Sequence, residues 1–241
     1  MIVLLTDFGQ SEYVGVVKAV IYGIARDAKI VDLCHDISPQ NIIEASWILK
    51  NNYKYFSPGA VFCCVVDPGV GTERKALAVK TENFYFVAPD NGLLWETLMQ
   101  QTIIEIRQIP VPPDASRTFH GRDVFAKAAV NIDLGNFNDV GEKIKEIEKL
   151  ELYQNQRGGL IVRIDRFGNI ITNLAKLDKD KYSIQTVGRK FVMNFCPDYD
   201  SANEGELFLI EGSCNTLEIS LKNGNAGDKL NVKVGDKITI S

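Results

Sequence analysis

The sequence has few of the residues and patterns that membrane proteins, nucleic-acid-binding proteins and zinc proteins need. None of its 241 residues lies in an apolar stretch approaching ~20 residues, the length that spans a bilayer, so we expect no membrane segment. Lysine and arginine are scattered and the formal charge is -4, which gives no basic patch for nucleic acid. With only two histidines, His35 and His120, the chain cannot form a His-rich transition-metal cluster.

Cysteine is also sparse and poorly placed for disulfides or zinc. The cysteines are odd in number, contain no CxxC pair, and include two neighbours inside a strand-like run: Cys34, Cys63, Cys64, Cys196 and Cys214. This pattern favours buried thiols in a reducing compartment. The N-terminal sequence MIVLLTDFGQ lacks the basic leader and the cleavage site of a signal peptide. We therefore expect a cytoplasmic protein.

The first half of the chain has the alternating pattern of an α/β domain. Hydrophobic residues make up 45% of the sequence and charged residues 24%, which is ordinary for a globular protein. Buried-strand runs alternate with segments of helical apolar spacing. The expected strands are residues 1–6, 29–34, 61–66, 76–81 and 84–90. The expected helices are residues 11–28, 39–56, 92–100 and 121–135, the second capped by Ser38 and begun by Pro39.

The second half reads as a small antiparallel β domain. Short strand-like runs are separated by turn residues, and no helix is evident. The expected strands are residues 159–167, 182–187, 190–195, 206–212, 216–221, 229–234 and 237–241, with a tight reversal at Gly235-Asp236. Such a series predicts an antiparallel barrel or sandwich. The charged stretch 142–159 separates the halves, so we predict an α/β domain over residues 1–150 and a β domain over residues 151–241.

Three of the expected strands end in an acidic residue that a glycine-containing turn follows: Asp7, Asp67 and Asp90. Ligands of open α/β domains bind beyond the carboxyl ends of the strands, so three acids at such ends favour a binding site over plain turns. The GVG sequence of residues 69–71 lacks the spacing of a phosphate-binding loop, and the acids would repel a phosphate. A neutral or cationic ligand with hydroxyl groups suits carboxylates better.

An acid, a permanent cation and an imidazole each follow a strand-like run or a connector: Asp67, Arg74 and His120. If they converge in one cleft, they could hold and polarise a water molecule for hydrolysis by displacement, without a metal or a covalent nucleophile. Asp7, Asp67 and His120 also fit a metal-dependent hydrolase. The second histidine, His35, fits a hydrogen-bonded core or loop residue.

Two further segments carry aromatic and amide side chains that suit a ligand. TFHGRDVF places Phe119 beside His120 at an expected helix N-terminus, where its ring would pack on an apolar part of the ligand. IDRFGN brings Asp165, Phe167 and Asn169 into one reversal. Either this segment is a plain hairpin turn, or Phe167 stacks on a base and Asn169 reads its edge with a donor and an acceptor.

Six segments, in this order, resemble the S-adenosylmethionine (SAM) hydrolases, also called SAM hydroxide adenosyltransferases, which are relatives of the fluorinases and chlorinases. The segments are TDFG, DPGVGTER, APDNGLL, TFHGRDVF, IDRFGNIITN and EGE…GS…LEI. The resemblance implies an α/β N-terminal domain, a C-terminal antiparallel β-barrel and a homotrimer with its sites at subunit interfaces. It also implies cleavage of SAM by water to adenosine and L-methionine, with no cofactor and no metal.

The resemblance implies roles for individual residues as well. Asp67, Arg74 and His120 would hold and polarise the attacking water. The other roles concern the substrate: Asp7 would take the ribose hydroxyls, Glu12 and Asp165 the methionine ammonium, Ser213 the methionine carboxylate, and Phe167, Asn169 and Tyr199 the adenine. After Ser213 the chain reads Cys214-Asn215-Thr216, where the family usually has a glycine two residues after the serine.

Two alternatives to hydrolysis of SAM are halogenation and binding without turnover. Halogenation is disfavoured because a halide needs a dehydrated pocket of neutral donors, and the carboxylate of Asp67 would repel it. The halogenases also carry an inserted loop, whereas residues 80–92 pass directly from strand to strand. The alternative to an enzyme is a SAM- or adenosine-binding sensor with little turnover, although such a protein has no use for Asp67, Arg74 and His120.

Overall fold

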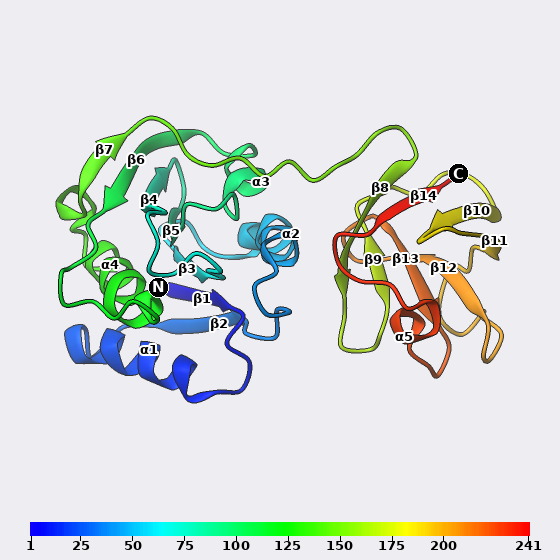
Figure 1. Cartoon of the computed structure of the whole chain (residues 1–241), viewed down its shortest axis with the longest axis horizontal. Coiled ribbons are helices and arrows are strands. Elements are labelled where there is room, and N and C mark those ends of the chain that lie inside the picture. The colour runs from blue at the N-terminus through cyan, green and yellow to red at the C-terminus, as the bar shows by residue number, and fades with distance from the viewer. The chain divides into compact units, whose positions relative to one another are not determined.

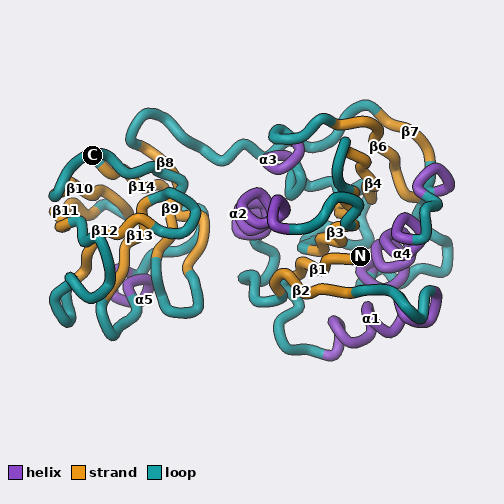
Figure 2. Tube along the Cα trace, turned by 180° about the vertical axis from the view of Figure 1, so that it is seen from behind, coloured by secondary structure: helices purple, strands orange, loops and turns teal.

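The structure, a computed structural model, describes residues 1–241 and consists of two compact units, Met1–Glu151 and Leu152–Ser241 (Figure 1). The N-terminal unit holds most of the helical residues, and the C-terminal unit consists mainly of strands and turns (Figure 2). None of the helices is both long enough and apolar enough to cross a membrane.

A mixed seven-stranded sheet forms the centre of the N-terminal unit (Figure 1). Its strands are β1 (Ile2–Thr6), β2 (Ile30–Cys34), β3 (Val61–Val65), β4 (Ala76–Thr81), β5 (Tyr85–Pro89), β6 (Ile103–Ile109) and β7 (Glu142–Ile144). The order is β2-β1-β3-β5-β4-β6-β7. In this order, β2, β1, β3 and β5 are parallel to one another, and β4, β6 and β7 each run antiparallel to their neighbours. The carboxyl ends of β1, β3 and β5 therefore lie at one edge of the sheet.

Helices cover both faces of this sheet, which makes the unit an α/β sandwich as predicted. The helices are α1 (Glu12–Ile24), α2 (Ile42–Asn52), α3 (Trp95–Leu98) and α4 (Ala126–Asp133). Along β1, Ile2 and Leu4 pack with α1 and α4, whereas Val3 and Leu5 pack with α2 and α3. Because both faces are covered, β1 and β3 are buried at every position, which explains why their sequences are continuous apolar runs.

The C-terminal unit is an antiparallel β-barrel, also as predicted. Its strands are β8 (Gly158–Ile164), β9 (Ile170–Thr172), β10 (Lys181–Thr186), β11 (Arg189–Asn194), β12 (Leu207–Glu211), β13 (Leu217–Leu221) and β14 (Lys237–Ile240). They follow the order β11-β10-β14-β8-β9-β13-β12. A bridge between Phe195 and Leu209, and a 2.8 Å hydrogen bond from the Cys196 amide to the Leu209 carbonyl, join the two outer strands. This contact closes the sheet around one apolar core.

The start of the second helix differs from the prediction in a way that matters for the site. The N-cap is Asn41, whose side chain accepts a 3.0 Å hydrogen bond from the Glu44 amide, and not Ser38. Pro39 and Gln40 form a turn in which Gln40 has a left-handed φ of 65°. The turn is held because the Gln40 amide donates to Asp7 across 2.7 Å. A contact with a distant strand end thus delays the helix.

The barrel unit contains a helix where the sequence predicted a strand. The prediction for residues 229–234 was wrong, because α5 (Ala226–Leu230) covers the start of that range. Asn225 caps this helix by accepting from the Asp228 amide, and Asn231 ends it in the left-handed region. The alternating apolar residues of 229–234 imitate a strand, but local capping decides the structure. Strands β6, β7 and β9 were also missed.

Candidate active site

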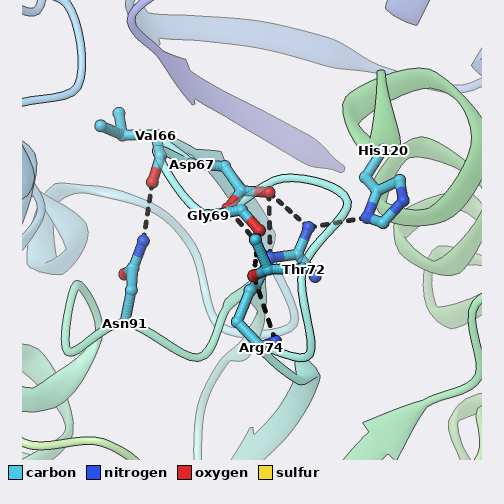
Figure 3. A network of polar contacts seen from close by, with 7 residues as sticks. All are labelled: Val66, Asp67, Gly69, Thr72, Arg74, Asn91 and His120. Carbon is cyan, nitrogen blue, oxygen red and sulfur yellow. Dashed lines mark hydrogen bonds and ion pairs between the residues drawn. The ribbon is translucent and has the colours of Figure 1, made fainter. Parts of the chain in front are cut away.

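Asp67 and Arg74 form a buried ion pair in the loop that joins β3 to β4. The Arg74 Nε lies 2.9 Å from Oδ1 and 3.1 Å from Oδ2 of Asp67, and Arg74 Nη2 also donates to Oδ2 (Figure 3). The Arg74 side chain is 9% exposed and the Asp67 side chain 6%. A guanidinium that contacts a carboxylate through two nitrogens fixes the orientation of both groups. The ion pair therefore stands at the carboxyl end of β3, where the sequence predicted a functional acid.

The glycine-rich turn PGVGTER explains how this pair is held. Gly71 has a φ of +76°, and a Cβ on it would lie 2.3 Å from the Arg117 carbonyl oxygen. Only glycine allows both this backbone conformation and this close approach. Thr72 closes the turn by donating from Oγ1 to the Gly69 carbonyl across 2.7 Å (Figure 3). The GVG sequence is thus a tight structural turn that brings Arg74 back to Asp67.

His120 extends the pair into a chain of three residues. Arg74 Nη2 lies 2.7 Å from His120 Nδ1, and the imidazole is only 4% exposed (Figure 3). An arginine guanidinium can only donate, so Nδ1 accepts and the ring proton lies on Nε2. Burial lowers the pKa of His120, and the positive charge of Arg74 lowers it further, while Asp67 and Asp123 oppose the shift. The site holds a neutral imidazole that offers an Nε2–H donor.

Position in the fold brings the three residues together. His120 directly precedes one turn of π-helix, Gly121–Phe125, which continues into α4. On one face of the sheet, α4 packs against the Val61, Cys63 and Val65 side chains of β3. A cavity of about 410 Å³ borders on both Arg74 and His120, and Lys75 and Arg117 also line it. Arg74 Nη1 is buried without a hydrogen-bond partner. The geometry supplies donors beside a space large enough for water.

Asp7 lies at the end of β1 and accepts a 2.7 Å hydrogen bond at Oδ2 from the Gln40 amide. Its pKa is raised chiefly by burial, against the hydrogen bonds from the backbone, and the charge of Asp67 adds to the rise. That electrostatic influence places the two carboxylates in one neighbourhood, as their positions on adjacent parallel strands require. Asp7 and Asp67 thus follow the carboxyl ends of neighbouring strands at one edge of the sheet.

Asp90, at the end of β5, has a structural role in this arrangement. Its carboxylate accepts a 2.7 Å hydrogen bond from the Glu148 amide and so anchors the segment that leaves the sheet. The next residue, Asn91, donates from Nδ2 to the Val66 carbonyl across 2.9 Å (Figure 3). Because Val66 precedes Asp67, Asn91 positions the acid. Asn91 was not predicted as a site residue, although it lies in the segment APDNG at the carboxyl end of β5, the strand next to β3.

Aromatic rings gather beside these polar residues. Phe119 packs edge-on against Phe8, with ring centroids 5.9 Å apart, and against Tyr13 at 5.1 Å. Tyr13 is 46% exposed and Phe119 is partly buried, so the group presents an apolar surface. Glu12 is exposed at the first position of α1. Phe8 and Tyr13 were not predicted as site residues, because a single aromatic in a helix or turn carries no sign of such packing.

The predicted residues of the C-terminal unit line one large pocket of about 1,080 Å³. All five appear in its wall: Asp165, Phe167, Asn169, Tyr199 and Ser213. Phe167 is 77% exposed and Tyr199 is 48% exposed. Exposed aromatic rings beside a pocket are suited to stacking on a planar ligand.

Asp165 organises the loop between β8 and β9. Its Oδ1 accepts from the amides of Phe167 and Asn169, each at 2.9 Å, and its Oδ2 accepts from Asn169 Nδ2 at 3.0 Å. Asn169 Nδ2 also lies 3.3 Å from the Tyr199 hydroxyl. The segment is therefore a hairpin turn, and the same bonds orient Phe167 and Asn169. The two interpretations of this segment are compatible.

His35 is a hydrogen-bonded loop histidine, as predicted. Its Nδ1 lies 2.8 Å from Thr6 Oγ1, its Nε2 lies 3.1 Å from Asp32 Oδ1, and its carbonyl accepts from the Gly9 amide. It fixes the loop after β1. No group of three or more His, Cys, Asp and Glu side chains in the chain is arranged to hold a metal ion. The cation of Arg74 between Asp67 and His120 would repel a metal placed there.

Comparison with known proteins identifies the class. The family description "SAM hydroxide adenosyltransferase N-terminal domain" matches residues 2–141, and the corresponding C-terminal domain matches residues 159–239. The chain therefore belongs to the SAM hydroxide adenosyltransferase family, and the predicted resemblance is confirmed.

Particular relatives match along the whole length. A protein of Methanocaldococcus jannaschii named (R)-S-adenosyl-L-methionine hydrolase is 36% identical, with 100% of this chain and 95% of that protein covered. A protein of the same name from Thermus thermophilus is 33% identical, with 96% and 95% covered. Among solved structures, an uncharacterized conserved protein from Thermotoga maritima is 37% identical over the full length of both chains, with a TM-score of 0.91.

Proposed function

We propose that this protein hydrolyses SAM to adenosine and L-methionine by in-line attack of water on the ribose C5′ carbon. The observation that carries the proposal is the buried chain from Asp67 through Arg74 to His120. The full-length relatives that are named (R)-S-adenosyl-L-methionine hydrolases support the same activity. From their name we extend the preference for the (R) sulfonium to this chain.

The reaction needs placement of water more than it needs a strong base. The C5′–O bond forms as the C5′–S bond breaks, the electron pair goes to sulfur, and the water loses one proton to solvent. The sulfonium is already a good leaving group. Holding water and substrate in line can lower the barrier by up to roughly 7–11 kcal/mol.

The three residues suit this task because each offers a different contact. Asp67 accepts a hydrogen bond from the water and stabilises the positive charge that develops on its oxygen. His120 donates from Nε2–H to that oxygen and sets the direction of its lone pair. Arg74 holds both in position. Since the His120 Nδ1 lone pair is occupied by Arg74, the imidazole is an orienting donor rather than the base.

The remaining contacts follow the predicted roles. Asp7 is proposed to accept hydrogen bonds from the two ribose hydroxyls, and Phe119 to pack on an apolar part of the substrate. Glu12 and Asp165 would face the methionine ammonium, Ser213 its carboxylate, and Phe167, Asn169 and Tyr199 the adenine. The residues proposed for the C-terminal unit all line its pocket: Asp165, Phe167, Asn169, Tyr199 and Ser213. In the N-terminal unit, Asp7 follows β1 and Phe119 precedes His120, whereas Glu12 is exposed at the start of α1.

We further propose a cytoplasmic homotrimer. The proposed roles are divided between the N-terminal unit, which holds Asp67 and His120, and the C-terminal unit, which holds Phe167 and Asn169. A site at a subunit interface would combine both. Sedimentation equilibrium should give three chains per particle, and a monomer that turns over SAM would contradict this arrangement.

The experiment is incubation of the purified protein with each sulfonium epimer of SAM in EDTA, with adenosine and methionine measured by liquid chromatography. Equal amounts of both products are expected, faster from the (R) epimer. Asp67→Asn should lose most of the rate while SAM still binds. Binding without any product over long incubation at high enzyme concentration would favour a sensor, and activity abolished by EDTA would favour a metal-dependent hydrolase.

A further inference from the structure

A second acid lies in the pocket of the C-terminal unit. Glu218 belongs to β13, is 8% exposed, and lines the same pocket as Asp165 and Ser213. A buried carboxylate is costly unless a cation or hydrogen-bond donors compensate it. Its location therefore requires a reason.

The loop between β12 and β13 fits closely around this carboxylate. A Cβ on Gly212 would lie 1.7 Å from Glu218 Oε1, so the glycine leaves the space that the acid fills. The loop itself is tight, with the Gly212 amide bonded to the Thr216 carbonyl and Asn215 in the left-handed region at a φ of 59°. The loop thus holds Glu218 in the wall of the pocket that Ser213 also lines.

The charges around Glu218 leave a negative excess. Burial raises the pKa of Glu218, the nearby charge of Asp165 adds to the rise, and only Arg163 opposes it. The wall of the pocket carries four acids, Asp165, Asp200, Glu211 and Glu218, against three cations, Arg163, Arg166 and Lys222. A cation on a bound ligand would supply the missing positive charge.

The hydrogen-bonding capacity of the two acids differs. A carboxylate has about four lone-pair sites, and Asp165 uses three of them on the Phe167 amide, the Asn169 amide and Asn169 Nδ2. Asp165 can therefore accept about one more hydrogen bond. A primary ammonium has three N–H donors and needs further acceptors. Glu218 is the buried acid placed to provide them.

We propose that Glu218 is a specificity-determining residue that receives a primary ammonium of the ligand, together with Asp165. This inference rests on the proposed function, in which that ammonium is the amino group of the methionine part of SAM. A sulfonium has no N–H and makes no comparable demand on acceptors. Glu218 thus selects for the amino acid part of the substrate, and Asp165 mainly shapes the loop.

The test compares SAM with 5′-deoxy-5′-dimethylsulfonioadenosine, which keeps the sulfonium and lacks the amino acid. Glu218→Gln removes the charge at nearly constant volume. We expect KM for SAM to rise about 10- to 100-fold, as for loss of one hydrogen bond to a charged group, with kcat changed less than about threefold. KM for the truncated sulfonium should stay the same. Equal changes for both substrates, or no change for either, would overturn the proposal.

Glu211→Gln is the matched control, because Glu211 lines the same pocket but is exposed. It should change KM for SAM less than about twofold, since solvent screens its charge. Glu218→Asp keeps the charge and replaces Glu218→Gln in the test if Glu218→Gln does not fold. The Glu218→Asp enzyme should still discriminate between SAM and the truncated sulfonium, and loss of that discrimination would count against the proposal. If the wild type turns over neither substrate, the proposed function fails. Calorimetric SAM affinity of wild type and Glu218→Gln then still tests the ammonium contact.

Discussion

Arg74 Nη2 lies 2.7 Å from His120 Nδ1, so the guanidinium occupies the lone pair through which this imidazole would otherwise act as a base. The same guanidinium neutralises Asp67. A cation that binds an acid on one side and an imidazole on the other fixes both in position, and its charge adds to burial in lowering the pKa of the imidazole. This relationship favours catalysis by orientation of water.

Replacement of Arg74 by lysine should damage the reaction although the positive charge remains. A lysine ammonium is a point charge that cannot hold Asp67 through two nitrogens and reach His120 as well. We expect kcat to fall about 10²-fold or more while KM for SAM changes little. Arg117→Lys, in the wall of the same cavity, is the control and should keep its rate. A fully active Arg74→Lys enzyme would show that charge alone suffices.

The dependence of activity on pH should reflect the neutral state of His120. Its pKa lies below the ordinary 6.5, first because of burial and then because of Arg74. A proton on Nδ1 would face the donor of Arg74 and break the contact. The rate should therefore be constant near neutral pH and fall on an acidic limb whose midpoint lies below 6.5. A kcat profile with its midpoint at or above 6.5 would contradict this assignment.

The same shift predicts the direction in which stability changes. The unfolded chain takes up the His120 proton near 6.5, whereas the folded chain takes it up only at lower pH. The unfolded state thus binds more protons, so this residue makes the folded state less stable as pH falls through that range.

Gly71 should be far less tolerant of alanine than Gly59. Both have a positive φ, +76° and +87°, but a Cβ on Gly71 would meet the Arg117 carbonyl oxygen at 2.3 Å, whereas Gly59 has nothing within 4 Å. Gly59→Ala should cost about 1–2 kcal/mol of unfolding free energy from backbone strain alone. Gly71→Ala should cost roughly 3 kcal/mol or more and reduce activity. Calorimetric unfolding of both variants tests this, and equal losses would contradict the packing described.

Cys63 and Cys64 should resist thiol reagents in the folded protein. Both are fully buried in β3, and burial raises the pKa of Cys63 to about 12 and that of Cys64 well above its ordinary value. Reaction needs the thiolate, so neither should react before unfolding. Peptide mapping after brief alkylation should find label first at the partly exposed Cys34 and Cys214. Label on Cys63 in the native state would show that β3 opens readily.

Much of the fold could be predicted because it follows from local pattern. β1 and β3 are covered on both faces and so read as continuous apolar runs, and the acids at their ends mark the edge where ligands bind. The approach of Asp67, Arg74 and His120 was expected from the quoted motifs. The tautomer of His120 was not, since it depends on which nitrogen faces Arg74.

The missed features depend on contacts between distant segments. Gln40 is drawn into a turn by Asp7, which no local rule anticipates. Glu218 alternates with apolar neighbours in TLEISL and therefore resembles a solvent-facing strand residue. Closure of the barrel and the tight loop at Gly212 bury it in the pocket wall instead. Sequence periodicity cannot distinguish a solvent face from a polar pocket.

The most direct test of the central claim is to run the reaction in ¹⁸O-labelled water and analyse the products by mass spectrometry. Attack of water on C5′ predicts one ¹⁸O in the 5′-hydroxyl of adenosine and none in methionine, at the same yield in EDTA. Asp67→Asn and His120→Ala should lower the yield without moving the label. Unlabelled adenosine, or cleavage that releases adenine in its place, would contradict the account.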